Sequence, residues 1–315
     1  MKRQSVSVKT NRKLTERKPE WLKVRPPSGQ NFHHIKRALW TYNLHTVCEE
    51  AHCPNIGECW SGGTATLMLM GDTCTRGCRF CAVKTGNPRS HLDPLEPMKV
   101  AKTVRDWGLR YVVLTSVDRD DLPDGGSGHF ATTVRMIKRE HPDVLIEVLI
   151  PDFQGDVDAL GKIVAAEPQV IAHNVETVER LTLQVRDVRA KYRQSLAVLE
   201  HMKRLNPEIY TKSSLMVGLG ETEAEVRQTM HDLREVDVDI LTVGQYLRPS
   251  QRHIEVTEYV PPEQFDRYRR MGEELGFLYV ASGPFVRSSY RAGEFFIERI
   301  IRGEDRNGKA HPSQG

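Results

Sequence analysis

Residues 64–81 read Thr-Ala-Thr-Leu-Met-Leu-Met-Gly-Asp-Thr-Cys-Thr-Arg-Gly-Cys-Arg-Phe-Cys, and this stretch decides the fold. Its apolar first part is typical of a buried strand. Its second part holds Cys74, Cys78 and Cys81 at C-x3-C-x2-C spacing. Three thiolates so close together can hold three irons of a four-iron cluster and leave the fourth iron open to a substrate or cofactor. The stretch therefore predicts an iron–sulfur loop at the end of a strand.

The other three cysteines, Cys48, Cys53 and Cys59, form a second group with C-x4-C-x5-C spacing. Six cysteines could also form disulfides, but that pattern is typical of short secreted chains. Structural zinc is the stronger alternative, because zinc also takes close cysteines. Zinc usually takes two pairs of ligands, whereas each group here offers three thiolates and no obvious fourth ligand. The spacing favours iron–sulfur clusters over zinc.

Size and charge bound the class of protein. The 315-residue chain is long enough for one barrel-sized domain or two smaller ones. It has no apolar signal core and no run of about 18 apolar residues, so we expect no membrane span. Six thiolates predict a reducing compartment, most simply the cytoplasm.

The first 40 residues hold eleven Lys or Arg and two Glu. This composition predicts a solvated, mobile basic arm that could contact an acidic partner. A mitochondrial transit peptide has weak support, because the apolar positions of the arm lack a helical period. The arm also lacks interleaved aromatic residues, and we expect no nucleic-acid binding.

From residue 64 onward, strand-like and helix-like stretches alternate, which predicts a parallel sheet with right-handed crossovers. Six such units indicate a partial (β/α)6 barrel rather than a closed eight-unit barrel. The predicted strands span residues 64–70, 111–115, 144–150, 170–173, 211–217 and 240–243. The predicted helices span residues 94–107, 129–140, 156–166, 191–205, 222–236 and 262–275, and a late strand at 276–283 could extend the sheet.

The same pattern divides the chain into five parts. These are a basic arm at residues 1–40, a segment at 41–63 with the second cysteine group, the barrel at 64–260, a C-terminal extension at 261–300 and a polar tail at 301–315. Because the chemistry of such barrels sits where strands end, the cysteine loop falls on the functional face.

The motifs resemble a known family. The C-x3-C-x2-C motif with Phe80 before its last cysteine resembles the radical S-adenosylmethionine superfamily. Within it, residues 50–60, 71–81 and 282–290 are similar to the lipoyl synthase family, the last stretch through Arg287-Ser288-Ser289-Tyr290. The resemblance covers roughly residues 40–295, shows no departure in these motifs and leaves out the basic arm. It implies a partial barrel of the radical S-adenosylmethionine type with N- and C-terminal extensions.

The resemblance also implies a reaction. Cys74, Cys78 and Cys81 would hold a four-iron cluster whose open iron binds S-adenosylmethionine. One electron then breaks the sulfonium bond, and a 5′-deoxyadenosyl radical removes hydrogen from an unactivated carbon. The implied substrate is an octanoyl chain on a lipoyl carrier domain, which gains sulfur at carbons 6 and 8.

The second cysteine group resembles the ligands of the family's auxiliary cluster, whose sulfide supplies the inserted sulfur. The resemblance implies that Cys48, Cys53 and Cys59 hold three irons and that a serine, Ser289 rather than Ser288, holds the fourth. An oxygen ligand matches a soft cluster less well than a thiolate does. A weaker bond at one iron would suit a cluster that comes apart during turnover, and we state this as a hypothesis.

Several further residues are candidate contacts of S-adenosylmethionine. Asp118, Asn174 and Glu176 lie at predicted strand ends and suit its ribose and amine, whereas Arg189 could meet its carboxylate bidentately. Phe80 lies within the cysteine motif. Each polar candidate could equally be an ordinary turn or helix-cap residue, and a surface arginine is the commoner case.

The implied partners follow from this chemistry. They are octanoylated lipoyl carrier domains of 2-oxoacid dehydrogenase complexes and the glycine cleavage H protein, an electron donor such as flavodoxin or ferredoxin, and an iron–sulfur carrier protein. Two alternatives stay open. One is a radical S-adenosylmethionine enzyme whose auxiliary cluster only transfers electrons, and the other is a zinc-stabilised binding protein without enzymatic activity.

Overall fold

A computed structural model describes residues 18–23, 30–61, 66–289 and 300–301. An eight-stranded sheet lies at its centre, in the order β1-β2-β5-β6-β7-β8-β9-β10. All neighbouring strands pair in parallel except β1, which is antiparallel to β2. Its strands are β1 His45–Thr46, β2 Thr66–Leu69, β5 Tyr111–Ser116, β6 Leu145–Leu149, β7 Val170–Ala172, β8 Tyr210–Val217, β9 Ile240–Gln245 and β10 Tyr279–Gly283.

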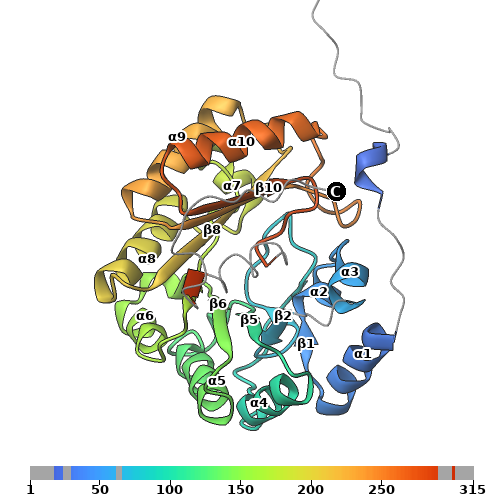
Figure 1. Ribbon diagram of the computed structural model, residues 1–315, viewed down its shortest axis with the longest axis vertical. Helices are drawn as coiled ribbons and strands as arrows, with labels where there is room; N and C mark the ends of the chain where they lie inside the picture. The colour runs from blue at the N-terminus through green and yellow to red at the C-terminus, as the bar shows by residue number, and fades with distance from the viewer. Residues whose placement is uncertain (1–17, 24–29, 62–65, 290–299, 302–315) are drawn as a thin grey trace, which may run out of the picture.

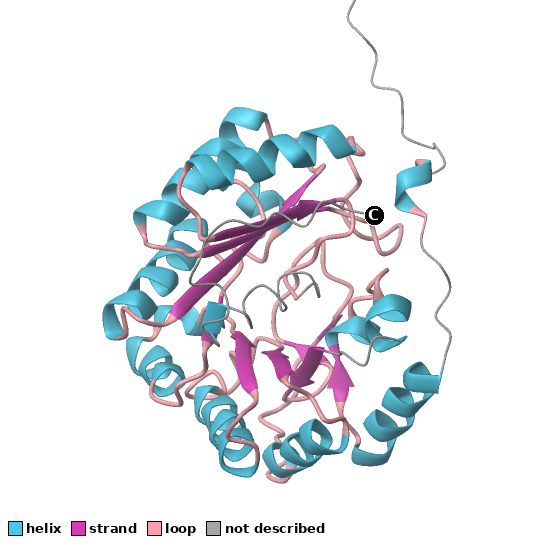
Figure 2. Cartoon of the chain, in the orientation of Figure 1, coloured by secondary structure: helices cyan, strands magenta, loops and turns pink. Residues whose placement is uncertain are grey.

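Helices cover the outside of this curved sheet, one between each pair of successive parallel strands (Figures 1 and 2). Within the described residues no pairing joins β10 to β1, so the barrel is partly open, as the sequence predicts. The crossover helices are α4 Glu96–Asp106, α5 Ser127–Glu140, α6 Val157–Val164, α8 Tyr192–Leu205, α9 Glu223–Glu235 and α10 Pro262–Glu274. The shorter elements are α7 Thr182–Val185, the 3-10 turns Glu20–Leu22, Phe153–Gly155 and Glu179–Leu181, and a two-stranded sheet of β3 Thr73–Cys74 and β4 Lys84–Thr85.

Local sequence explains why these elements form where they do. Thr222 accepts a hydrogen bond from the Glu225 backbone N–H, and the Glu225 side chain accepts one from the Thr222 backbone N–H, so α9 starts with a complete capping box. Val226, Met230 and Leu233 then recur at helical spacing, and each is fully buried. The late strand is also confirmed, because β10 pairs in parallel with β9.

Successive side chains of a strand belong alternately to two apolar clusters. Val112 and Leu114 of β5 belong to the large core beneath the helices, whereas Tyr111 and Val113 belong to a small second cluster. Beside this second cluster lies a buried ion pair, in which Lys212 Nζ of β8 is 2.7 Å from Glu147 Oε1 of β6. Tyr111 donates a 2.6 Å hydrogen bond to the other oxygen of the same carboxylate. The pair thereby fixes three strands relative to one another.

One structured part falls within the predicted basic arm. Helix α1 spans Gln30–Tyr42, and its Ile35 and Leu39 are buried. These two positions are one helical turn apart, so a short apolar stripe exists at the end of a segment whose overall composition is basic. The prediction of a solvated arm therefore does not hold for α1, and Leu22 is buried as well. Residues 1–17 and 24–29 lie outside the described residues, as do 302–315 of the predicted tail.

The second cysteine group lies at the open side of the barrel. Helices α2 Val47–Glu50 and α3 Ile56–Ser61 lie between β1 and the end of β10 (Figure 1). Asn55, between these helices, donates a 2.7 Å hydrogen bond from Nδ2 to the Phe285 carbonyl oxygen. This bond ties the N-terminal segment to the chain that follows β10.

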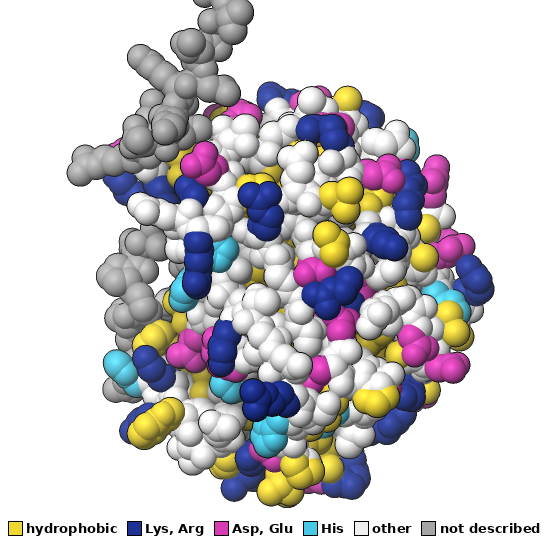
Figure 3. Space-filling view, turned by 180° about the vertical axis from the view of Figure 1, so that it is seen from behind, with side chains coloured by type: hydrophobic (Ala, Val, Ile, Leu, Met, Phe, Trp, Pro, Cys, Tyr) yellow, Lys and Arg dark blue, Asp and Glu magenta, His cyan; other side chains and the backbone are white. Residues whose placement is uncertain are grey.

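The surface mixes both signs of charge. On the face shown in Figure 3, Lys and Arg side chains alternate with Asp and Glu, and hydrophobic side chains are scattered among them. Among the described helices, none combines the length and the apolar character that a membrane span requires.

The Lys212–Glu147 pair yields a stability prediction. Lys212→Met leaves a buried carboxylate without its cation, so we expect the free energy of unfolding to fall by about 3–5 kcal/mol in urea titrations. The matched control is Lys138→Met, which removes the pair with the exposed Glu167 and should cost less than about 1 kcal/mol. Equal losses in both variants would contradict the structural role of the buried pair.

Candidate functional site

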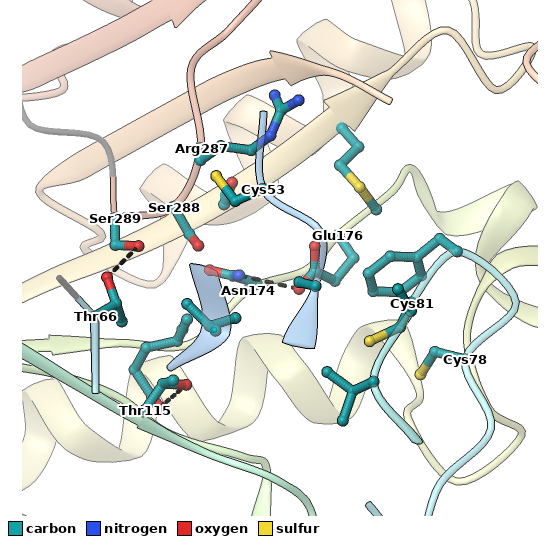
Figure 4. A pocket seen from close by; sticks show the side chains of 18 of the residues that line it. Cys53, Thr66, Cys78, Cys81, Thr115, Asn174, Glu176, Arg287, Ser288 and Ser289 are labelled. Carbon is teal, nitrogen blue, oxygen red and sulfur yellow. Dashed lines mark hydrogen bonds between the residues drawn. The ribbon is translucent and has the colours of Figure 1, made fainter. Parts of the chain in front are cut away.

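One cavity of about 480 Å³ opens at the carboxyl ends of the barrel strands. Both cysteine groups line it, although they come from opposite sides of β2 in the sequence. Figure 4 shows Cys78 and Cys81 at one side of this cavity and Cys53 with the two serines at the other. The sequence-predicted residues that line it are Cys48, Cys53, Cys59, Cys74, Cys78, Phe80, Cys81, Asp118, Asn174, Glu176, Ser288 and Ser289.

Arg76 holds the loop of the first cysteine group in place. Its side chain is almost fully buried, yet it carries a positive charge that needs partners. The guanidinium donates from Nε and Nη2 to the Asp120 carboxylate at 2.9 and 2.8 Å and from Nη1 to Asp152 Oδ2 at 2.8 Å. Asp118 lies 3.4 Å from its Nε. Because these carboxylates follow β5 and β6, the network ties the cysteine loop to two strand ends.

The structure does not bring Arg189 into the cavity. Its Nε donates 2.8 Å to Asp187 Oδ1, and its Nη1 donates 3.1 Å to Asp120 Oδ2. Its Nη2 also donates 2.9 Å to the Thr75 carbonyl oxygen. Arg189 therefore braces the cysteine loop from outside instead of presenting a free fork to a carboxylate ligand.

The thiols of the first group are neutral without metal. Burial raises the pKa of Cys74 and Cys81 to about 12 and that of Cys78 to about 11. Backbone N–H groups nevertheless point at two of the sulfurs, from Arg76 to Cys74 Sγ at 3.4 Å and from Asp187 to Cys78 Sγ at 3.3 Å. Such donors stabilise metal-bound thiolates. A metal that binds this loop must therefore displace the protons of the three thiols.

The donor set fits an iron–sulfur cluster. All six cysteines are free thiols, so no disulfide competes for them. Burial also raises the pKa of Cys53 in the second group. Three soft sulfur ligands on each side of the cavity match the ligand preference of iron–sulfur clusters. Among the described residues, no three His, Cys, Asp or Glu side chains form a group that could hold a single metal ion.

Asn174 and Glu176 face the cavity just beyond β7. Asn174 Nδ2 donates a 3.0 Å hydrogen bond to Glu176 Oε1. The other amide atom, Asn174 Oδ1, is buried and has no partner in the described part of the chain. Glu176 has a backbone φ of 66°, in the left-handed region that costs free energy for this residue type. A buried acceptor without a partner, beside a carboxyl carried on strained backbone, suits a ligand with ammonium or hydroxyl donors.

Asp118 lies beside the first cysteine group. Burial raises its pKa to about 6, although the Arg76 guanidinium opposes this shift. Its Oδ2 accepts a 3.7 Å hydrogen bond from Cys74 Sγ. Asp118 is thus a part of the network that supports the loop as well as a residue of the cavity wall.

The segment after β10 approaches the barrel very closely. A Cβ atom added to Gly244 of β9 would lie 2.1 Å from the Val286 carbonyl oxygen. Only glycine allows this approach, which sets the position of the following Arg287, Ser288 and Ser289. Burial lowers the pKa of Arg287, and the nearby Cys53 opposes this shift. Tyr290, the last residue of the motif, lies outside the described residues.

Sequence reasoning missed three of these supporting residues. Arg76 lies inside the C-x3-C-x2-C motif. Arginine is always charged, so its presence in a buried loop indicates that carboxylates lie nearby. Asn55 lies between two cysteines of the second group, but nothing in the sequence indicates its bond to residue 285. Gly244 carries no local signal, because its φ is not in the left-handed region and only the tertiary approach requires it.

Comparison with known proteins identifies the family. A model of the radical SAM superfamily matches residues 68–233. A model of the N-terminal domain of lipoyl synthase, of the radical SAM family, matches residues 2–53. The second match corrects the sequence analysis, which left the basic arm outside the family resemblance.

Curated relatives match over nearly the whole chain. The lipoyl synthase of Myxococcus xanthus is 58% identical over 290 residues, which is 92% of this chain and 97% of that protein. The mitochondrial lipoyl synthase of Aedes aegypti is 58% identical over 291 residues, which is 91% of this chain and 74% of that protein. Among solved structures, the FeFe-hydrogenase maturase HydG from Carboxydothermus hydrogenoformans aligns with a TM-score of 0.52 at 13% identity, covering 85% of this chain and 71% of that chain. This last likeness concerns the fold alone. The chain belongs to the lipoyl synthase family of the radical SAM superfamily.

Proposed function

We propose that this chain inserts two sulfur atoms at carbons 6 and 8 of an octanoyl group bound to a carrier protein, and so forms the lipoyl group. Membership of the lipoyl synthase family supports this activity. The observation that carries it is that both cysteine groups line one cavity. A substrate bound in that cavity would face both groups.

Two four-iron clusters are part of the proposal. Cys74, Cys78 and Cys81 would hold the first, with one iron left open for S-adenosylmethionine. Cys48, Cys53, Cys59 and Ser289 would hold the auxiliary cluster. When bound, the first cluster would supply the electron that cleaves S-adenosylmethionine, and the auxiliary cluster would supply the sulfur.

The residues of the chain position these groups and the substrate. Asn174 and Glu176 offer acceptors to the amine or ribose of S-adenosylmethionine, and Phe80 lines the wall beside the first group. Met68 and Met216 give the cavity a flexible apolar lining that suits an alkyl chain.

The proposed partners follow from the reaction. They are an octanoylated lipoyl carrier domain, a one-electron donor such as flavodoxin or ferredoxin, and an iron–sulfur carrier protein that rebuilds the consumed cluster. Six free cysteines suit a reducing compartment, and the cytoplasm is our prediction for this chain. The mosquito relative is named as mitochondrial, so the family is not confined to one compartment.

Separate variants of the two cysteine groups test whether the first group cleaves S-adenosylmethionine and the second supplies sulfur. Cys53→Ala should still cleave S-adenosylmethionine, because the first group is intact, but should add no sulfur to an octanoylated carrier peptide. Cys74→Ala should do neither. Anaerobic assays with a reductant measure deoxyadenosine by chromatography and the peptide product by mass spectrometry.

Two outcomes would change the assignment. Sulfur insertion by Cys53→Ala at the rate of the unchanged protein would contradict the role of the auxiliary group. Deoxyadenosine without any sulfur insertion by the unchanged protein would favour the alternative in which the auxiliary cluster only transfers electrons.

The close approach at Gly244 yields a structural test of the auxiliary site. Gly244→Ala forces the Val286 backbone away, so we expect the variant to lose the auxiliary cluster, about half of the bound iron, and to stop inserting sulfur. Cleavage of S-adenosylmethionine should persist at the first site. The matched control is Gly161→Ala on the outer helix α6, where an added Cβ meets nothing within 4 Å and both activities should be kept. Full iron content in Gly244→Ala would show that the segment tolerates displacement.

A further inference from the structure

Thr66 joins two distant segments of the chain at the cavity wall. It is the first residue of β2, its side chain is almost fully buried, and its Oγ1 donates a 2.9 Å hydrogen bond to Ser289 Oγ. Figure 4 shows this bond at the side of the cavity that also holds Cys53. Strand β2 pairs with β1 on one edge and β5 on the other, so the Thr66 hydroxyl is attached to a rigid element.

Two other contacts bring Ser289 to this point. Asn55 binds the Phe285 carbonyl oxygen, and Gly244 admits the Val286 backbone. The chain from residue 285 to 289 is thus fixed near its start by these two contacts, and Thr66 fixes its far end. Ser288 has no hydrogen-bond partner in the described part of the chain, which sets it apart from its neighbour.

The chemistry of the bond gives Thr66 a role. A serine that ligates iron has lost its proton, so its oxygen can only accept hydrogen bonds. The Thr66 hydroxyl can donate, and a donor stabilises an anionic oxygen and orients it. Partners of this kind around metal ligands change metal affinity by about 10–100-fold.

We propose that Thr66 is a positioning residue for the auxiliary cluster, which holds Ser289 in place and stabilises its iron-bound oxygen. This inference rests on the proposed function, in which Ser289 is the fourth ligand. The strength of the Thr66 bond then sets how readily the fourth iron leaves. Thr66 would act through Ser289, which it contacts directly.

Loss of the fourth iron can be measured without turnover. In full-length protein with Cys74, Cys78 and Cys81 changed to alanine, only the auxiliary group can hold a cluster. Mild anaerobic oxidation with ferricyanide converts a four-iron cluster that loses one iron into a three-iron cluster, which electron paramagnetic resonance detects. In this background Thr66→Val should lose the iron about tenfold faster, and Thr66→Ser, which keeps the hydroxyl, should lose it at the unchanged rate.

A control threonine separates this effect from general destabilisation. Thr103 of α4 is also fully buried, and its Oγ1 donates to the Lys99 carbonyl oxygen away from the cavity. Thr103→Val should leave the rate of iron loss unchanged. If Thr66→Val assembles no cluster at all, the serine variant decides: assembly by Thr66→Ser supports the proposal, and failure overturns it.

A double-mutant cycle tests whether Thr66 changes the rate of iron loss through Ser289. If Thr66 acts through Ser289, Thr66→Val should add nothing in a Ser289→Ala background. Equal acceleration in both backgrounds, or a Thr66→Val rate equal to that of the unchanged protein, would overturn the inference.

The serine variants distinguish this inference from the proposed function. If Ser289→Ala accelerates iron loss and Thr66→Val does not, only the role of Thr66 falls. If Ser288→Ala accelerates it and Ser289→Ala does not, the ligand assignment on which both rest is wrong.

Discussion

The buried Arg76 guanidinium is the interaction on which the site depends. A charge with almost no solvent contact must be matched by carboxylates, and these come from the loops after β5 and β6. Parallel strands deliver their carboxyl ends to one edge, so the network exists only when the barrel has formed. The folded sheet therefore positions the cysteine loop through these contacts. Arg189 braces the same loop from the outer side.

The two halves of the cavity are assembled by different means. The first cysteine group belongs to one short loop, which charged side chains hold to the barrel. The second group depends on contacts between distant parts of the chain: Asn55 with the Phe285 backbone, Gly244 with Val286, and Thr66 with Ser289. In the proposed function, Ser289 is the auxiliary-cluster ligand that comes from a segment distant in sequence from the cysteines. Its position in the cavity therefore depends on these contacts.

Much of this could be predicted from the sequence, for identifiable reasons. The strands are apolar runs and the helices have clear periods, so the partial barrel followed from local patterns. The cysteine spacing predicted the two groups of thiols that line the cavity, because such motifs are local in sequence. Helix α1 was missed because a basic composition concealed Ile35 and Leu39. Arg189 was expected at the cavity but is not among the residues that line it, and Thr66 was overlooked. Both side chains contact partners more than 60 residues away, and no local pattern records such contacts.

The proposed function requires that the auxiliary cysteine group supplies sulfur to a substrate held in the same cavity. The most direct measurement uses protein whose clusters are rebuilt with heavy-isotope sulfide and then incubated anaerobically with reductant, S-adenosylmethionine and an octanoylated carrier peptide in ordinary sulfide-free buffer. We expect the peptide to gain two sulfurs, both of which carry the heavy isotope in the mass spectrum. A lipoyl peptide that contains only ordinary sulfur would contradict it.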